Sequence, residues 1–311
     1  MPKKIPQLVK LVQESKIKQT RANKHISYSQ LSSFENCPKQ WYLTYVKNLA
    51  PYKPSIHAVF GTAMHETIQT WLDVLYNDTI KKANEMDLEA LLLENMHKAY
   101  KAQKAMYSHE HFSDQKELES FLKDGVAILE FLKKKRVLYF SSKNTYLAGI
   151  ETLLYQELRP GVFFKGLIDI VLYNETVDKW YVIDLKTSTS GWSDYVKKDD
   201  TKIAQVLLYK EFFAKQFNID EREKIEVVYY ILKRKVPVEA EFASMQRRVQ
   251  EFKPPSGKIK TGKAVSMMNR FVQETLDQAG NFFDKDFQAT PSESSCRFCV
   301  FRNNPICPQG V

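Results

Sequence analysis

The sequence contains no uninterrupted apolar run that approaches the roughly 18 residues needed for a membrane-spanning helix. We therefore expect no membrane partner. The lysines and arginines near the N-terminus are not followed by an apolar segment, so no secretion signal is indicated and an intracellular, cytoplasmic protein is expected. Apolar residues still make up 43% of the 311 residues, which is enough for the core of one large or two modest domains.

Cysteine is scarce, with four residues in the whole chain. Cys37 stands alone near the start, whereas Cys296, Cys299 and Cys307 crowd the end. An intracellular protein makes little use of disulfides. A Cys-x-x-Cys pair with a third cysteine close by and a distant fourth fits one four-ligand site, which would tie the chain ends together. Unrelated buried or free thiols are the alternative.

Acidic residues are outnumbered, 37 against 46 basic ones, and the net charge of +9 favours a polyanionic partner such as nucleic acid. Residues 1–24 contain a single acidic side chain, Glu14, and are predicted to form a basic N-terminal arm. Its basic residues are Lys3, Lys4, Lys10, Lys16, Lys18, Arg21 and Lys24.

A second basic stretch, residues 246–263, is predicted to be a flexible loop that binds a phosphate backbone, although a solvated run of charge fits it equally well. Part of it, Gly257 to Ala264, imitates the phosphate-binding loop of nucleotide hydrolases. Ala264 lacks the hydroxyl that would hold Mg²⁺, and Pro254 lies where a buried strand is needed, so nucleotide hydrolysis is rejected. The basic side chains are Arg247, Arg248, Lys253, Lys258, Lys260 and Lys263.

The spacing of apolar residues predicts an α/β protein. Steps of three and four indicate an amphipathic helix, followed by a helical insertion. Segments rich in strand formers then indicate a three-stranded antiparallel meander, and a helix leads to one more strand that can lie parallel to its neighbour. The elements are expected at residues 58–76, about 80–145, 146–158, 162–173, 180–187, 201–217 and 225–232, with a last helix at 265–283.

The segment Asp184-Leu-Lys186 places a carboxylate and an amine inside an apolar strand. Residues two apart on a strand point to the same face, so Asp184 and Lys186 form one polar pair. Burying either charge alone would cost several kcal/mol, and the site must supply an ion, an anionic substrate or the other residue as partner. An exposed ion pair on an edge strand is the alternative interpretation.

Asp169 is the single charged residue in the apolar run that follows Gly166. A lone buried carboxylate is typical of a divalent metal site, because Mg²⁺ takes one or two carboxylates and fills its other positions with water and phosphate oxygens. A turn or strand-end position is the alternative. His65 borders the apolar stripe of the first helix, where an imidazole can be a metal ligand or a histidine satisfied within the core.

Two further pairs could contact a substrate. Gln205 and Tyr209 are four apart on a predicted helix and share one face, where they could touch a phosphate or orient Lys186. Trp192 and Tyr195 follow the Asp184 strand in a loop and could stack on unpaired bases, with loop anchoring as the alternative.

Taken together, these residues resemble the PD-(D/E)XK nuclease superfamily, in particular its RecB-like branch of CRISPR-associated and helicase-linked nucleases with an iron–sulfur cluster. The resemblance runs from about Ile26 to Cys307. It implies one nuclease domain over residues 25–311, with a restriction-endonuclease-like core of helix, three-stranded antiparallel meander, helix and strand. The region 80–145 would be an insertion, and residues 291–311 with Cys37 would form a cluster-binding clasp.

The resemblance also implies roles for the residues. His65, Asp169, Asp184 and the carbonyl of Leu185 would hold Mg²⁺ or Mn²⁺, and Lys186 would position or activate the attacking water. Gln205 and Tyr209 would shape the active site and touch the DNA backbone. A four-iron, four-sulfur cluster would be held by Cys37, Cys296, Cys299 and Cys307.

The expected function is that of a metal-dependent exonuclease acting on single-stranded DNA or DNA ends in replication, recombination or repair. A catalytically silent DNA-binding or assembly subunit on the same fold is the alternative. The gap from Cys299 to Cys307 is longer than this branch suggests, so a structural Zn²⁺ site, in a zinc-clasped structural protein, is a third possibility. Because the sequence has no helicase motif, the protein is expected to act alone or with a separate helicase or recombination partner.

Overall fold

The computed structural model of the chain describes residues 5–17, 19, 23–107, 110–239, 242 and 245–308. Lys3, Lys4, Lys18 and Arg21 of the expected N-terminal arm lie outside the described residues. Part of the arm is a packed helix, α1 (Gln7–Gln13), because it carries apolar residues between its lysines. Val9 and Val12 are buried in the core, and Gln13 Nε2 donates a 2.8 Å hydrogen bond to the carbonyl of Leu147.

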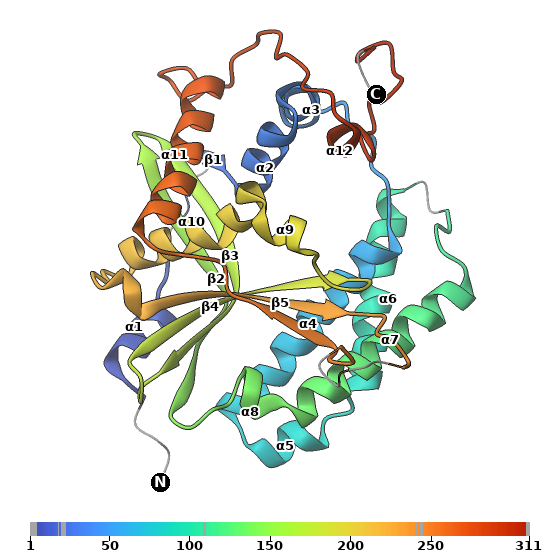
Figure 1. The fold of residues 1–311 in the computed structure, drawn as a ribbon, viewed down its shortest axis with the longest axis vertical. Coiled ribbons are helices and arrows are strands. Elements are labelled where there is room, and N and C mark those ends of the chain that lie inside the picture. The colour runs from blue at the N-terminus through green and yellow to red at the C-terminus, as the bar shows by residue number, and fades with distance from the viewer. Residues whose placement is uncertain are drawn as a thin grey trace.

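A mixed sheet of six strands forms the centre of the molecule (Figure 1). The meander is confirmed, since β3 pairs antiparallel with both β2 and β4, and β5 lies parallel to β4 as expected. Two short strands were not predicted: β1 pairs parallel with the start of β3, and β6 pairs antiparallel with β5. The strands are β1 (Lys24–Ile26), β2 (Thr145–Arg159), β3 (Val162–Asn174), β4 (Lys179–Ser188), β5 (Ile225–Lys233) and β6 (Val249–Phe252).

Strand β3 is shared by two neighbours on the same edge. Residues 162–164 pair with β1, and residues 170–174 pair with β4. The pairing with β4 stops at Ile170 and Ile183, after which β4 continues beside β5 alone. Strands β3 and β4 therefore separate at Asp169, which precedes the paired stretch of β3, and at Asp184, which follows the paired stretch of β4.

Helices cover both faces of the sheet (Figure 1). One core lies under the helices of the termini and of the second half of the chain, and contains Val182 and Phe213. These helices are α1, α2 (Tyr28–Asn36), α3 (Pro38–Trp41), the π-helical turn η1 (Tyr42–Val46), α9 (Asp194–Lys198), α10 (Asp200–Gln216), α11 (Lys258–Thr275) and α12 (Glu293–Cys296), with a 3-10 turn η2 (Arg222–Lys224).

The other core lies between the sheet and the helices of the predicted insertion, and contains Trp71 and Leu185. The expected amphipathic helix is α4, whose apolar stripe includes the buried Met64, Ile68 and Leu72. The region 80–145 is helical as expected up to the start of β2. The helices on this face are α4 (Ile56–Asn77), α5 (Ile80–Glu85), α6 (Leu88–Met106), α7 (Gln115–Lys134) and α8 (Arg136–Tyr139).

The prediction of a flexible loop over residues 246–263 is wrong. Residues 249–252 form β6, and α11 begins at Lys258 and ends at Thr275, so the last helix also starts and stops earlier than expected. The strand forms because β5 offers an unpaired edge to β6. Lys260 and Lys263 both pair with Asp200, which fixes the first turns of α11.

Among the described residues, no helix combines the length and the apolar character needed to cross a bilayer.

Candidate active site

Asp184 and Lys186 lie on β4 where that strand has separated from β3. Asp184 is 1% exposed, and its Oδ2 lies 2.7 Å from Nζ of Lys186. The pair is not the exposed ion pair of the alternative interpretation, because Asp184 is buried even though this stretch of β4 is paired with β5 alone. Lys186 is only partly buried and faces a pocket, so its ammonium group can neutralise Asp184 and still reach a bound molecule.

Asp169 bridges the division between β3 and β4. Its Oδ2 accepts a 2.6 Å hydrogen bond from the main-chain N–H of Leu185, which replaces the ladder bond that the diverging strands no longer make. The alternation of β3 breaks here too: Ile168 belongs to the core on one face, whereas Ile170 belongs to the core on the other. The buried carboxylate of Asp169 is thus held at the opening between two strands.

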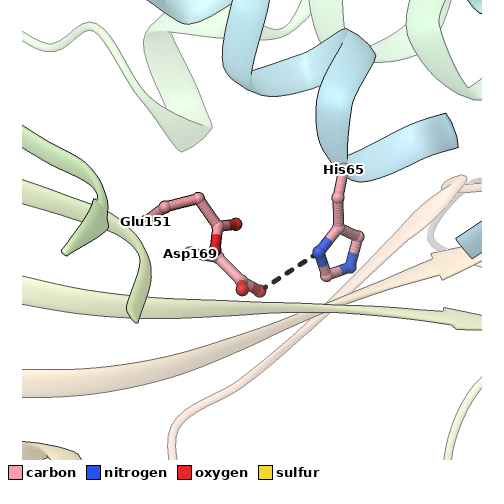
Figure 2. Close-up of side chains that lie close together, drawn as sticks. All are labelled: His65, Glu151 and Asp169. Atoms are coloured by element: carbon pink, nitrogen blue, oxygen red, sulfur yellow. Dashed lines mark ion pairs between the residues drawn. The ribbon is translucent and has the colours of Figure 1, made fainter. Parts of the chain in front are cut away.

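His65 reaches this opening from α4. Its neighbours Ala63, Met64 and Ile68 anchor the helix in the core, so the imidazole projects toward the sheet. Nδ1 of His65 lies 3.6 Å from Oδ2 of Asp169, as Figure 2 shows. Burial lowers the pKa of His65, an effect opposed by the charge of Asp184. The imidazole is therefore neutral at pH 7, the form that binds metals.

Glu151 completes this group, and sequence reasoning missed it. Ligand atoms of Glu151, His65 and Asp169 all lie within 4.8 Å of one another (Figure 2). Glu151 lies on β2 with a φ of 49°, in the left-handed region that costs a residue with a side chain of order 1–3 kcal/mol. Its Oε1 accepts a 2.5 Å hydrogen bond from Nε2 of Gln69, a buried residue of α4. The hydrogen bond from Gln69 holds the carboxylate beside Asp169 and helps to offset the cost of this backbone conformation.

The carboxyl groups of the opening are hard to ionise in the protein alone. Burial raises the pKa of Asp169 to about 6, although the hydrogen bond from Leu185 and the charge of Lys186 lower it. Burial also raises the pKa of Asp184 to about 6, again with Lys186 opposing. The charge of Lys186 therefore offsets only part of the free-energy cost of burying the two carboxylates in their ionised form.

The donor set fits a divalent cation. The carboxylate oxygens of Glu151 and Asp169 are ligands for hard divalent cations, and a neutral imidazole nitrogen is a ligand for transition-metal ions. The separation of 3.6 Å between His65 and Asp169 exceeds a hydrogen bond and leaves room for a shared ion. Among the described residues, this is the group of histidine, cysteine and acidic side chains that meets the geometry of a metal site. Asp184 and Leu185 lie next to it on β4.

A pocket of about 550 Å³ opens beside these residues, and the predicted pair on α10 lines it. Gln205 Nε2 donates a 3.1 Å hydrogen bond to the hydroxyl of Tyr209, as their spacing suggested. Gly166 permits this arrangement, because a Cβ there would lie 2.9 Å from Cε1 of Tyr209. Lining residues include Tyr28, Gly166, Asp169, Asp184, Lys186, Gln205 and Tyr209.

The four cysteines gather around one region, although 259 residues separate the first two (296 minus 37), and among the described residues they do not form a group with the geometry of a metal site. Cys37 follows α2, where Pro38 begins α3, and Cys296 ends α12, whose first turn is closed by a capping box of Ser292 and Ser295. All four cysteines line one small pocket. Burial raises the pKa of the Cys299 thiol, and the three other sulfur groups, Cys307, Cys37 and Cys296, raise it further.

The predicted nucleic-acid contacts are spread over several elements. The main-chain N–H of Trp192 donates a 2.7 Å hydrogen bond to Oε1 of Gln250, and the Trp192 ring packs against Tyr229. Trp192 therefore anchors its loop, and it also lines a groove. Tyr195 is 80% exposed. Several of the predicted basic residues already have partners inside the chain: Lys253 with Glu226 and Glu251, Lys260 and Lys263 with Asp200, and Arg248 with the carbonyl of Arg234. Arg247 and Lys258 complete the predicted set.

Comparison with known proteins places this geometry in a family. The family model described as the PD-(D/E)XK nuclease superfamily matches residues 25–308. No curated protein matches the chain. A crystal structure from Eubacterium rectale, of a protein named "Putative exonuclease", has 14% sequence identity and a TM-score of 0.47, and the match covers 83% of this chain and 86% of that one. The family match spans nearly the whole described chain, and the protein therefore belongs to the PD-(D/E)XK nuclease superfamily.

Proposed function

We propose that this nuclease is a Mg²⁺- or Mn²⁺-dependent DNA exonuclease that hydrolyses phosphodiester bonds of single-stranded DNA or of DNA ends. The observation that carries the proposal is the meeting of His65, Glu151 and Asp169 within 4.8 Å, beside the pair of Asp184 and Lys186. The net charge of +9 favours a polyanionic substrate. Membership of the nuclease superfamily supports the reaction class.

The residues divide the work by their chemistry. His65, Asp169 and Glu151, with Asp184 and the carbonyl of Leu185 close by, are the groups that would hold the ion. When bound, the ion supplies positive charge for the phosphoryl oxygens and a more acidic water. The hydrogen bond from Leu185 orients Asp169 and leaves its second oxygen for other contacts.

Lys186 is the group in this site that can act on the water or the phosphate. Its ammonium lies 2.7 Å from Asp184 and borders the pocket, so it can donate hydrogen bonds to an oxygen placed there. Gln205 and Tyr209 form the opposite wall, where an amide and a phenol can contact the backbone of the strand. The pocket is thus acidic at its base and carries hydrogen-bond donors around its rim.

We also propose that the four cysteines hold a four-iron, four-sulfur cluster as a structural clasp between the chain ends. The shared pocket of Cys37, Cys296, Cys299 and Cys307 supports a common ligand. Four thiolates also suit Zn²⁺, which is the alternative. Protein purified without oxygen should be brown, absorb in the visible and contain about four iron atoms per chain. Colourless protein with one zinc per chain would favour the alternative.

Digestion of end-labelled DNA with each end blocked in turn tests the proposed activity. The wild type should degrade single-stranded DNA in Mn²⁺, stop in EDTA, and stop at one blocked end, which gives the polarity. The Asp184→Ala variant, assayed in parallel, should be inactive. Degradation equal in wild type and Asp184→Ala would reject the proposal. Salt-sensitive DNA binding without metal-dependent cleavage would instead identify a silent binding subunit.

A further inference from the structure

A groove of about 1020 Å³ leads away from the candidate active site. It begins at Lys186 and Gln205, which also line the pocket of Asp169 and Asp184. It then passes between α2 on one side and the start of α10 on the other, and ends at the segment that carries α12. Figure 1 shows α12 near α3, at the end of the molecule where the C-terminal segment lies. The groove and the site are therefore continuous.

The walls of this groove are rich in neutral hydrogen-bonding groups. Its two carboxylates are already occupied: Glu35 binds Arg270 at 2.6 Å, and Asp199 caps α10 through a 2.8 Å hydrogen bond from the N–H of Thr201. A phosphodiester strand would thus meet donors, and Lys202 in addition to Lys186, without facing a free carboxylate. The hydroxyl and amide groups come from Tyr28, Ser29, Ser32, Ser33, Asn36, Gln40, Thr201, Gln205, Thr290, Ser292, Ser294 and Ser295.

The far end of the groove carries an exposed aromatic ring. Phe298 is 83% exposed, although it lies between Cys296 and Cys299 in a tight segment whose next phenylalanine, Phe301, is 2% exposed. The guanidinium carbon of Arg297 lies 5.2 Å from the ring of Phe298. An exposed ring beside an arginine suits a base stacked on the ring and a phosphate held by the guanidinium.

We propose that the groove holds one strand of DNA that runs from the catalytic centre to Phe298, where an unpaired base stacks on the ring and Arg297 contacts the backbone. This inference rests on the proposed nuclease function and names its substrate as single-stranded. Stacking on Phe298 requires a base that is not paired within a duplex, because a paired base offers no free face. Because Phe298 lies between Cys296 and Cys299, the proposed clasp would also position this part of the substrate site.

Binding in EDTA tests this inference without cleavage. The probe is a 5′-labelled single strand of mixed sequence, measured by fluorescence anisotropy, with wild type, Phe298→Ala and Phe298→Trp. Loss of one stacked base predicts a Kd raised roughly tenfold in Phe298→Ala, and the tryptophan should restore binding. The matched control is Phe242→Ala, since Phe242 is 57% exposed and does not line the groove. Unchanged melting temperatures would show that all variants fold.

Oligonucleotides of increasing length, together with a duplex, distinguish a specific contact with the substrate from a general loss of DNA binding. Oligonucleotides too short to reach Phe298 should bind wild type and Phe298→Ala alike, and longer strands should bind the wild type better. Blunt duplex DNA should bind both proteins equally. The inference is overturned when Phe298→Ala binds long single strands as tightly as the wild type does. It is also overturned when the variant loses affinity for duplex and for single-stranded DNA to the same extent.

The same measurements distinguish this inference from the proposed activity. A protein that cleaves no DNA but loses single-strand binding in Phe298→Ala would reject the nuclease proposal and retain the groove. A protein that cleaves DNA, and whose variants Phe298→Ala and Phe242→Ala bind single strands equally well, would support the nuclease proposal and reject the groove.

Discussion

The carboxylate of Asp169 accepts a hydrogen bond from the main-chain N–H of Leu185, across the point where β3 and β4 separate. The same oxygen, Oδ2, lies 3.6 Å from Nδ1 of His65, so one side chain closes a gap in the sheet and also belongs to the group with His65 and Glu151. The structural task of Asp169 and its proposed metal-binding task can be separated by experiment. An asparagine still offers an oxygen to the N–H of Leu185, whereas an alanine does not.

We expect Asp169→Asn to keep its fold and lose metal binding. Asp169→Ala should in addition lower the free energy of unfolding by about 1–3 kcal/mol, because the buried N–H of Leu185 is left without a partner. Urea unfolding in EDTA measures the stability, and Mn²⁺ titration calorimetry measures the affinity. Equal stability of the two variants would contradict the structural role of the hydrogen bond.

Glu151→Gln should weaken Mn²⁺ binding and slow cleavage, each by roughly 10- to 100-fold, the range typical when a group that supports a metal site is changed. The amide oxygen can still accept the hydrogen bond from Gln69, so the melting temperature in EDTA should change little. Glu157→Gln is a suitable control, because Glu157 lies on the same strand away from the metal-binding group. Wild-type activity in Glu151→Gln would remove Glu151 from the site.

Metal binding should weaken as the pH falls through about 6. Burial raises the pKa of both Asp169 and Asp184 to about 6, so protons compete with the ion below that pH. The same shifts give the metal-free protein the opposite trend: a carboxyl whose folded pKa is raised favours the folded state more as the pH falls from about 6 toward the unfolded value. Melting temperatures with Mn²⁺ and with EDTA at pH 8 and pH 5.5 measure both trends. A stabilisation by Mn²⁺ that is equal at the two pH values would contradict this prediction.

Lys186→Met should slow cleavage by on the order of 100-fold or more while the protein still binds Mn²⁺, because the variant loses the charged donor proposed to act on the reacting oxygens. Cleavage at saturating Mn²⁺ measures the rate, and calorimetry checks that the ion still binds. Lys165→Met is the matched control, since Lys165 borders the same pocket without contacting Asp184. Equal rates for the two variants would show that Lys186 serves only as the counterion of Asp184.

Gly166→Ala should disturb the wall formed by Tyr209 and the neighbouring Phe164, because the added Cβ would lie 2.9 Å from Cε1 of each ring. Overpacking of this kind costs about 1–3 kcal/mol. Urea unfolding measures the loss, and Gly262→Ala, where a Cβ meets nothing within 4 Å, is the control. A neutral Gly166→Ala would mean that Tyr209 moves aside without cost.

Much of the nuclease core follows from local patterns. The apolar spacing placed α4, the meander, α10 and β5 close to their observed bounds, because each is long and amphipathic or strongly apolar. Short β1 and β6 carry too few residues for such a signal, and they exist because β3 and β5 offer edges to pair with. The many charged residues of 246–263 favour the prediction of a loop, and nothing local indicates that residues 249–252 pair with β5.

The site shows the same division. Asp169, Asp184 and Lys186 were found because charges in apolar strands are costly and therefore conspicuous. Glu151 carries a similar signal, as the single charged residue between Lys143 and Glu157, but its place beside Asp169 depends on strand pairing. Only the register of β2 and β3, which pairs Ile150 with Ile170 and Thr152 with Ile168, brings it opposite Asp169. Phe298 was likewise hidden, because an aromatic residue between two cysteines suggests burial.

The most direct test of the central claim compares cleavage of labelled single-stranded DNA by wild type and Asp169→Asn, purified side by side, in Mn²⁺ and in EDTA. The account predicts metal-dependent cleavage by the wild type, and a rate lower by roughly 100-fold or more in the variant at an unchanged melting temperature. Equal, metal-independent cleavage by both proteins would contradict the assignment of this site.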